Sequence, residues 1–357
     1  MSRVYLDHAA TSPLRPEARV AMEEGFAIWA NPSSPHAEGR KARAALEDAR
    51  ERCKKALDWK GELIFTSGAS EAAALALHRA KAGARLVSAV EHDCILNAVP
   101  DAERLPVLDC GQVILEELSA ALDRERPLVA IQDANSETGN RQPIFDISER
   151  VRKAGGLLLV DCAQTAGKVN LNTSVDMAIV SAHKFGGPIG IGALLVKDYA
   201  MLEPAGGHER GYRRGTENLP GALGMAAALE VNGYWTSGAP SVLYELEEPC
   251  KALGGTWLEN RLCAPLWYIQ AISMPGMSAQ AQVMRFDMAG ISVSQGSACS
   301  SGSMKTSRVL DAMQVDPAVA ANTIRVSLGW NTTCTDVERF CEVWLDLASK
   351  ASSSPRT

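Results

Sequence analysis

The sequence predicts an α/β fold with a mostly parallel sheet in a large domain and a smaller α+β domain behind it. Short apolar runs alternate with helical patterns, and these runs are nearly continuous, as in strands buried on both faces. The alternating pattern changes after about residue 240. A chain of 357 residues also exceeds the usual size of one core. We therefore expect a large domain at 11–238, and a small domain made of 1–10 and 239–357.

The expected strands of the large domain are six apolar runs, at 62–66, 85–90, 128–134, 156–161, 177–182 and 191–196. Helical patterns lie between these runs, at 37–57, 69–81, 115–124 and 146–154. Strands and helices in alternation imply right-handed crossovers and helices on both faces of the sheet.

The expected small domain has a different order of elements. It contains a helical pattern at 241–253, an apolar run at 266–272, a second helical pattern at 279–289, a strand at 323–328 and a final amphipathic helix from Asp336.

Composition excludes several classes of function. A net charge of −6 argues against direct binding of nucleic acid, and no window approaches the ~20 apolar residues of a membrane span. The nine cysteines are irregularly spaced without a CxxC pair, so we predict no metal site and reduced thiols. The first residues contain no apolar signal core, and the cytoplasm is the expected location.

Ligands in such sheets bind beyond the carboxyl ends of the strands, where this chain carries polar residues. The first strand is followed by "SGASEAAALAL", in which Gly68 permits a tight turn before a helix. The first N–H groups of that helix could bind a phosphate. The alternative is an ordinary helix capped by Ser67 or Ser70, with Glu71 in its first turn.

Two further strands end in chemically active residues. Asp161 ends the apolar run at 156–161, with Gln164 three residues later, although Asp161 could also cap the following segment. Lys184 follows the run at 177–182, next to His183 and a Gly-Gly-Pro turn. A phosphate site, a carboxylate and a lysine at successive strand ends fit pyridoxal 5'-phosphate. A dinucleotide site is disfavoured, because no G-x-G-x-x-G follows the first strand.

Taken together, the motifs closely resemble those of the cysteine desulfurases in the class V aminotransferase family. They occur in the family's order: "YLDHAATSP", "NPSSPHAEGR", "FTSGASEA", "VEHDCILNA", "ANSETGNRQPI", "VDCAQTAGK", "SAHKFGGPIGIGALLV", "GGHERGYRRGTEN" and "GSACSSGS". The resemblance implies the fold type I of pyridoxal-phosphate-dependent transferases, with a seven-stranded type of sheet. The serine-rich stretch resembles the members with a long catalytic loop.

The resemblance implies roles around the cofactor ring. Lys184 should hold the cofactor covalently and later move protons at the substrate Cα. His92 should stack on the ring and assist proton transfer, although on its own such a histidine is more often a core or cap residue. Asp161 should pair with the ring nitrogen, and Gln164 should bond the phenolic oxygen.

The resemblance also implies contacts to the cofactor phosphate, one of which comes from a second subunit. The residues expected to contact the phosphate are Ala69, Ser70, Ser181 and His183. Thr216 should reach the phosphate of the neighbouring subunit, which implies a homodimer with shared sites.

Further implied contacts concern the cofactor and the substrate. The family's tandem asparagine reads Asn135-Ser136 here, and either residue could contact the cofactor. Arg325 should bind the carboxylate of L-cysteine with help from Asn31, although a buried strand arginine could also be structural.

Cys299 lies in "SQGSACSSGSMK", a polar stretch without an apolar face to bury. The resemblance implies that its thiolate takes sulfur from L-cysteine as a persulfide, releases L-alanine and passes the sulfur to an acceptor protein. Such acceptors serve iron–sulfur cluster assembly or thiolation. Two alternatives remain open: a selenocysteine lyase or other β-lyase in which Cys299 is dispensable, and a non-catalytic homologue that only binds partners.

Overall fold

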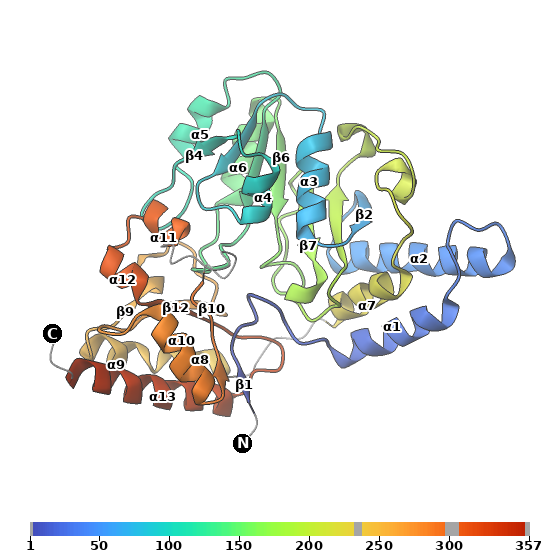
Figure 1. Cartoon of the computed structure of the whole chain (residues 1–357). Coiled ribbons are helices and arrows are strands. Elements are labelled where there is room, and N and C mark those ends of the chain that lie inside the picture. The colour runs from blue at the N-terminus through green and yellow to red at the C-terminus, as the bar shows by residue number, and fades with distance from the viewer. Residues whose placement is uncertain (1–2, 232–237, 297–306, 354–357) are drawn as a thin grey trace.

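A seven-stranded sheet forms the centre of the protein in the computed structural model, which describes residues 3–231, 238–296 and 307–353 (Figure 1). Its strand order is β2-β8-β7-β6-β5-β3-β4, and only β8 runs antiparallel to its neighbours. The strands are β2 (Glu62–Thr66), β3 (Arg85–Ser88), β4 (Glu103–Leu105), β5 (Leu128–Gln132), β6 (Leu157–Asp161), β7 (Met177–Ser181) and β8 (Gly192–Val196). The predicted α/β fold with a mostly parallel seven-stranded sheet is confirmed.

Helices cover both faces of this sheet, which explains the continuous apolar runs. Along β5, Leu128 and Ala130 pack into one cluster, whereas Val129 and Ile131 pack into another. The first cluster includes α3 (Ala69–Arg79) and α4 (Asp93–Ala98). The second includes α1 (Pro16–Ile28), α2 (Ala37–Ala56), α5 (Leu115–Ala121), α6 (Ile144–Lys153) and α7 (Leu219–Glu230).

A second region contains a three-stranded antiparallel sheet, β12-β10-β9, at the lower left of Figure 1. Its strands are β9 (Thr256–Trp257), β10 (Ile269–Ser273) and β12 (Thr323–Ser327). Its helices are α8 (Ala239–Tyr244), α9 (Glu247–Ala252), α10 (Ala279–Met288), α11 (Arg308–Ala312), α12 (Pro317–Ala321) and α13 (Cys334–Ser353). Phe286, Phe340 and Trp344 are fully buried in the core of this region.

The N-terminal segment joins this second region. β1 (Val4–Tyr5) pairs in parallel with β11 (Ile291–Ser292), and Leu6 is buried in the same core as Trp344. The division into domains at 11–238 and 239–357 stays a prediction. Within the described residues, no helix is both long enough and apolar enough to cross a membrane.

The helix expected at 241–253 is two helices, α8 and α9. Residues 245–246 between them form a turn. Pro249 has no N–H to donate to the carbonyl of Glu245, and a proline ring clashes with the carbonyl four residues before it. The single-helix prediction was therefore wrong at this proline.

Candidate active site

An N-terminal turn at residues 7–11 connects several of the predicted site residues. β7 ends at Ser181 and continues into a 3-10 turn, η1 (Ala182–Lys184). The Lys184 amine donates to the carbonyls of Ala9 and Ala10, each at 2.8 Å. The Gln164 amide donates to the same Ala9 carbonyl at 2.9 Å. The structure thus places Lys184 and Gln164 around one short turn.

Backbone hydrogen bonds explain why this turn lies at the sheet edge. Ser12 N donates to His183 O at 2.7 Å, and Arg15 N donates to Gly186 O at 2.8 Å. On the other side, Ala9 N donates to the hydroxyl of Ser327 in β12 at 2.9 Å. The turn therefore joins the end of the large sheet to the small sheet.

Asp161 is buried at the end of β6 and is 6% exposed. One carboxylate oxygen accepts from Ala163 N at 2.9 Å, and the other lies 4.0 Å from Cys94 Sγ. Burial raises the pKa of Asp161, while the positive charges of His92 and Lys184 act to lower that pKa. Asp161 thus caps the following turn, as the alternative predicted. A cationic ring nitrogen beside it would also stabilise its buried carboxylate charge.

His92 is exposed and forms the N-cap of α4. Its Nδ1 accepts from Cys94 N at 3.1 Å, and this bond fixes the orientation of the ring. His92 Nδ1 therefore has the cap role that the alternative predicted. This cap is compatible with a second role for the ring, which lies close enough to Asp161 to influence the pKa of that carboxyl.

The start of α3 offers an anion site. Ala69 and Ser70 begin the helix, and no side chain caps it at the preceding Gly68. The predicted alternative of a Ser67 or Ser70 cap is therefore wrong. A Cβ atom placed on Gly68 would lie 4.0 Å from the Ser181 hydroxyl. The uncapped helix terminus and the end of β7 thus lie together, as a phosphate site would need.

His183 has a defined environment beside Lys184. Its Nδ1 lies 3.1 Å from the Thr11 hydroxyl. Burial, together with the nearby charges of Lys184 and Lys168, lowers the pKa of His183 to about 4. The ring is therefore neutral at neutral pH and can act as a hydrogen-bond donor or acceptor.

The Asn135 side chain bonds its own loop and the carbonyl of Val90. Its oxygen accepts from Glu137 N at 2.9 Å and Thr138 N at 3.0 Å, and its amide donates to Val90 O at 3.2 Å. The next residue, Ser136, is half-buried and presents its carbonyl to Arg325 at 2.8 Å. Asn135 thus shapes the loop that places Ser136 beside the arginine.

Arg325 is buried in β12 and is 3% exposed. Its Nη1 donates to the Ser136 carbonyl, and its Nη2 donates to the Asp7 carboxylate at 2.7 Å. Its Nε is buried and has no hydrogen-bond partner among the residues that the structure describes. Arg325 is therefore held in place and still has N–H donors to offer, that of Nε among them. Asn31 is exposed, and its side chain accepts from Ser33 N at 2.8 Å within its own loop.

Two site residues were missed in the sequence. Lys168 donates to the side-chain oxygen of Gln164 at 3.4 Å, and its amine lies 5.2 Å from the Tyr268 ring centre. Burial lowers the pKa of Lys168 well below its usual value, and the charges of Lys184 and Arg325 add to this. The spacing of four residues from Gln164 was the available signal. Asp7, the partner of Arg325, stood in the first quoted motif.

Thr216 and Cys299 are the last two predicted site residues. Thr216 is exposed, three residues after Arg213, which bonds Glu71 of α3 at 2.9 Å. Cys299 lies outside the described residues. The chain that leads toward it pairs with β12, because Ser294 and Arg325 exchange backbone hydrogen bonds.

The chain matches the class-V aminotransferase family over residues 4–340. It is 36% identical to a cysteine desulfurase from Cereibacter sphaeroides, over 96% of this chain and 95% of that protein. It is 34% identical to a cysteine desulfurase IscS from Dictyoglomus turgidum, over 95% and 93%.

Solved structures also resemble this chain over most of its length. A NifS-like protein superimposes with a TM-score of 0.88 at 30% identity and covers 98% of this chain and 100% of its own. SspA in complex with cysteine superimposes with a TM-score of 0.77 at 28% identity, over 92% of this chain and 99% of its own.

Proposed function

The chain belongs to the class-V aminotransferase family and is a cysteine desulfurase, and from this premise we propose that it uses pyridoxal 5'-phosphate to pass the sulfur of L-cysteine through Cys299 to an acceptor protein. The observation that carries the proposal is the turn at residues 7–11, to which Lys184, Gln164 and Arg325 all bond. One short turn at the sheet edge thus binds a lysine, an amide and a buried arginine.

The residues present fit this cofactor. The uncapped start of α3, with Ser181 beside it, would hold the phosphate. Asp161 would pair with the protonated ring nitrogen, which compensates the burial of its carboxylate. Gln164 would bond the phenolic oxygen and Lys184 would bind the cofactor covalently. When bound, the cofactor supplies an electron sink that weakens bonds at the substrate Cα.

The substrate carboxylate would bind at Arg325. Two of its nitrogens are fixed by Asp7 and Ser136, and its Nε offers a donor. Lys184 would then move the proton at the substrate Cα, with the His92 ring close by. Asn31 is proposed to assist, from the loop after α1.

The Cys299 thiolate would attack the sulfur of L-cysteine. An S–S bond forms as the Cβ–S bond breaks, the bonding pair stays with the carbon, and protonation of that carbon gives alanine. The persulfide on Cys299 then carries the sulfur to the acceptor, in iron–sulfur cluster assembly or thiolation.

Assembly as a homodimer completes the proposal. Large apolar side chains are exposed on α1, on the turn after α1 and on the turn after β7: Val20, Phe26, Trp29 and Ile189. A second copy of the chain would cover them. Thr216 of one subunit would reach the phosphate held by the other. The eight cysteines that the structure describes are all free, which agrees with the proposed cytoplasmic location.

One assay tests this function. The purified protein, loaded with pyridoxal 5'-phosphate, is incubated with L-cysteine and a reductant, and sulfide and alanine are both measured. Equal amounts of the two support a desulfurase. Pyruvate and ammonia in place of alanine would instead indicate a β-eliminating lyase.

A further inference from the structure

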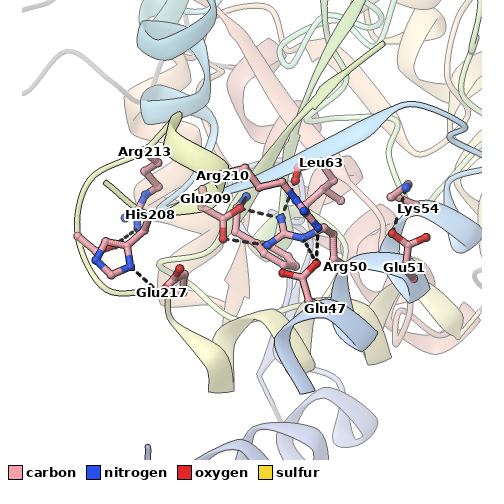
Figure 2. A network of polar contacts seen from close by, with 12 residues as sticks. Glu47, Arg50, Glu51, Lys54, Leu63, His208, Glu209, Arg210, Arg213 and Glu217 are labelled. Carbon is pink, nitrogen blue, oxygen red and sulfur yellow. Dashed lines mark hydrogen bonds and ion pairs between the residues drawn. The ribbon is translucent and has the colours of Figure 1, made fainter. Parts of the chain in front are cut away.

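An ion pair between Arg50 of α2 and Glu209 is buried at the edge of the large sheet (Figure 2). Two parallel bonds join the groups, at 2.7 Å from Nη1 to Oε2 and at 3.1 Å from Nη2 to Oε1. The two side chains are 2% and 1% exposed. Burial would lower the pKa of Arg50, but the hydrogen bonds and charge of Glu209 outweigh burial and raise it.

The pair is attached to the backbone of the edge strand β2. Arg50 Nη1 donates to Leu63 O at 2.5 Å, and Phe65 N donates to Glu209 Oε2 at 2.8 Å. β2 pairs with β8 on one side only. The ion pair therefore takes the position of a neighbouring strand along the free edge of β2.

Glu209 also holds an unfavourable backbone conformation. Glu209 and Arg210 both have left-handed backbones, with φ of 47° and 55°. Non-glycine residues rarely adopt this region, and it persists where the surroundings enforce it. Arg210 is itself bonded to Glu47 of α2 at 2.8 Å. The contacts with α2 therefore fix the direction in which the chain leaves this turn.

Beyond this turn the loop is attached at two more points. Arg213 bonds Glu71 in the first turn of α3 at 2.9 Å, and His208 Nδ1 lies 3.1 Å from Glu217. Between these attachments residues 214–216 are exposed. A polar tip held at both ends and open to solvent is suited to contact a group outside its own subunit.

We propose that the Arg50–Glu209 ion pair positions Thr216 for the cofactor phosphate of the partner subunit. The inference rests on the shared-site dimer proposed above. Replacing a buried ion pair by apolar residues is often neutral or stabilising, so a gain in stability does not by itself account for this pair. Arg50 and Glu209 are not among the residues proposed to hold the cofactor or the substrate, and their effect would appear in the other subunit's site.

The first measurement is the rate at which pyridoxal 5'-phosphate leaves the protein. Glu209→Gln removes the charge but keeps the shape, and it should speed release by ~10-fold, because charged hydrogen bonds are the strong ones. The matched control is Glu230→Gln. Glu230 of α7 pairs at 2.6 and 2.8 Å with Arg52 of α2, the helix that also carries Arg50. No bond described joins Glu230 to residues 208–217. The control should release the cofactor at the wild-type rate.

The second measurement asks which subunit's site is affected. Differently tagged Glu209→Gln and Lys184→Ala subunits are co-expressed and purified as a heterodimer. Its single lysine-bearing site lies in the Glu209→Gln subunit and receives Thr216 from an intact loop. Cofactor remaining on the Lys184 peptide is fixed with borohydride at intervals in cofactor-free buffer and counted by mass spectrometry.

We expect this heterodimer to retain the cofactor as the wild-type dimer does, whereas the Glu209→Gln homodimer loses it quickly. Fast loss in the heterodimer would show that Glu209 acts within its own subunit and would overturn the inference. Arg50→Lys, which keeps the charge but cannot make both parallel bonds to Glu209, repeats the test if Glu209→Gln does not fold. A wild-type protein that never binds the cofactor would instead contradict the proposed function itself.

Discussion

The Nη2 atom of Arg325 lies 2.7 Å from the carboxylate of Asp7, although the two residues are 318 positions apart. Arg325 belongs to β12 of the small sheet, and Asp7 belongs to the turn that also receives Lys184. The ion pair thus fixes the proposed substrate-binding group relative to the proposed cofactor-binding lysine.

Arg325→Lys tests this arrangement. A lysine keeps the charge but cannot hold Asp7, Ser136 and a substrate carboxylate with one planar group. We expect kcat/KM for L-cysteine to fall about 10- to 100-fold, mostly through KM, as for the loss of a charged hydrogen bond. The absorbance of bound cofactor should be unchanged. A wild-type KM in the variant would remove Arg325 from the substrate site.

Gly329→Ala tests the packing beneath the same turn. A Cβ at Gly329 would lie 1.9 Å from Nδ1 of His8, whose side chain is 1% exposed and cannot move away. Overpacking of this kind costs about 1–3 kcal/mol, and the melting temperature should fall. The double variant His8→Ala/Gly329→Ala removes the clash and should recover part of the loss. No difference between the single and double variants would contradict the close contact.

The pH dependence of stability can be predicted from Glu91. Its carboxyl is buried, and burial raises its pKa from 4.5 to about 8, although bonds from Ser88 and Gln132 N favour the charged form. The folded state therefore binds more protons than the unfolded state between these two values. Stability from this group is full below pH 4.5 and is lost as the pH rises through 8.

Glu91→Gln should remove this slope, because an amide does not titrate. Melting temperatures of wild type and variant, measured between pH 5 and pH 9 on the same buffer series, should separate as the pH rises, with the variant relatively more stable at high pH. Parallel curves across this range would show that Glu91 is not the titrating group.

Dimer formation can be tested at the exposed apolar surface. Trp29 is 78% exposed and Ile189 is 80% exposed, and they belong to the apolar surface that we propose a second copy of the chain covers. We expect a dimer at micromolar concentration in analytical ultracentrifugation, weakened by Trp29→Asp. Met288→Gln, equally exposed at 80% but on α10, is the control and should leave the dimer intact. A fully active wild-type monomer would contradict the shared site.

The large sheet could be predicted from the sequence because both faces of its strands are buried. Each of the six apolar runs corresponds to a strand, and the helices between them begin and end within a few residues of the expected positions. β4 (Glu103–Leu105) was missed because it is a short edge strand in which only Leu105 is buried. An apolar pattern does not reveal a strand of that kind.

The site could be predicted only in part. Lys184 and Asp161 follow strands directly, so their position at the sheet edge was readable. The contacts of Lys168 with Gln164, and of Asp7 with Arg325, depend on how the N-terminal turn packs. For Asn135, the resemblance suggested a contact with the cofactor, whereas the bonds of its side chain are made to its own loop and to Val90.

The role of Cys299 is the central claim, and mass spectrometry tests it most directly. Wild-type protein and Cys299→Ser are each loaded with cofactor, exposed once to L-cysteine without reductant and digested. We predict one added sulfur on the wild-type peptide that carries Cys299. The variant should keep its cofactor colour but release no alanine, because a serine hydroxyl is hardly ionised at neutral pH. Sulfur found on another cysteine, or wild-type alanine release by Cys299→Ser, would contradict the account.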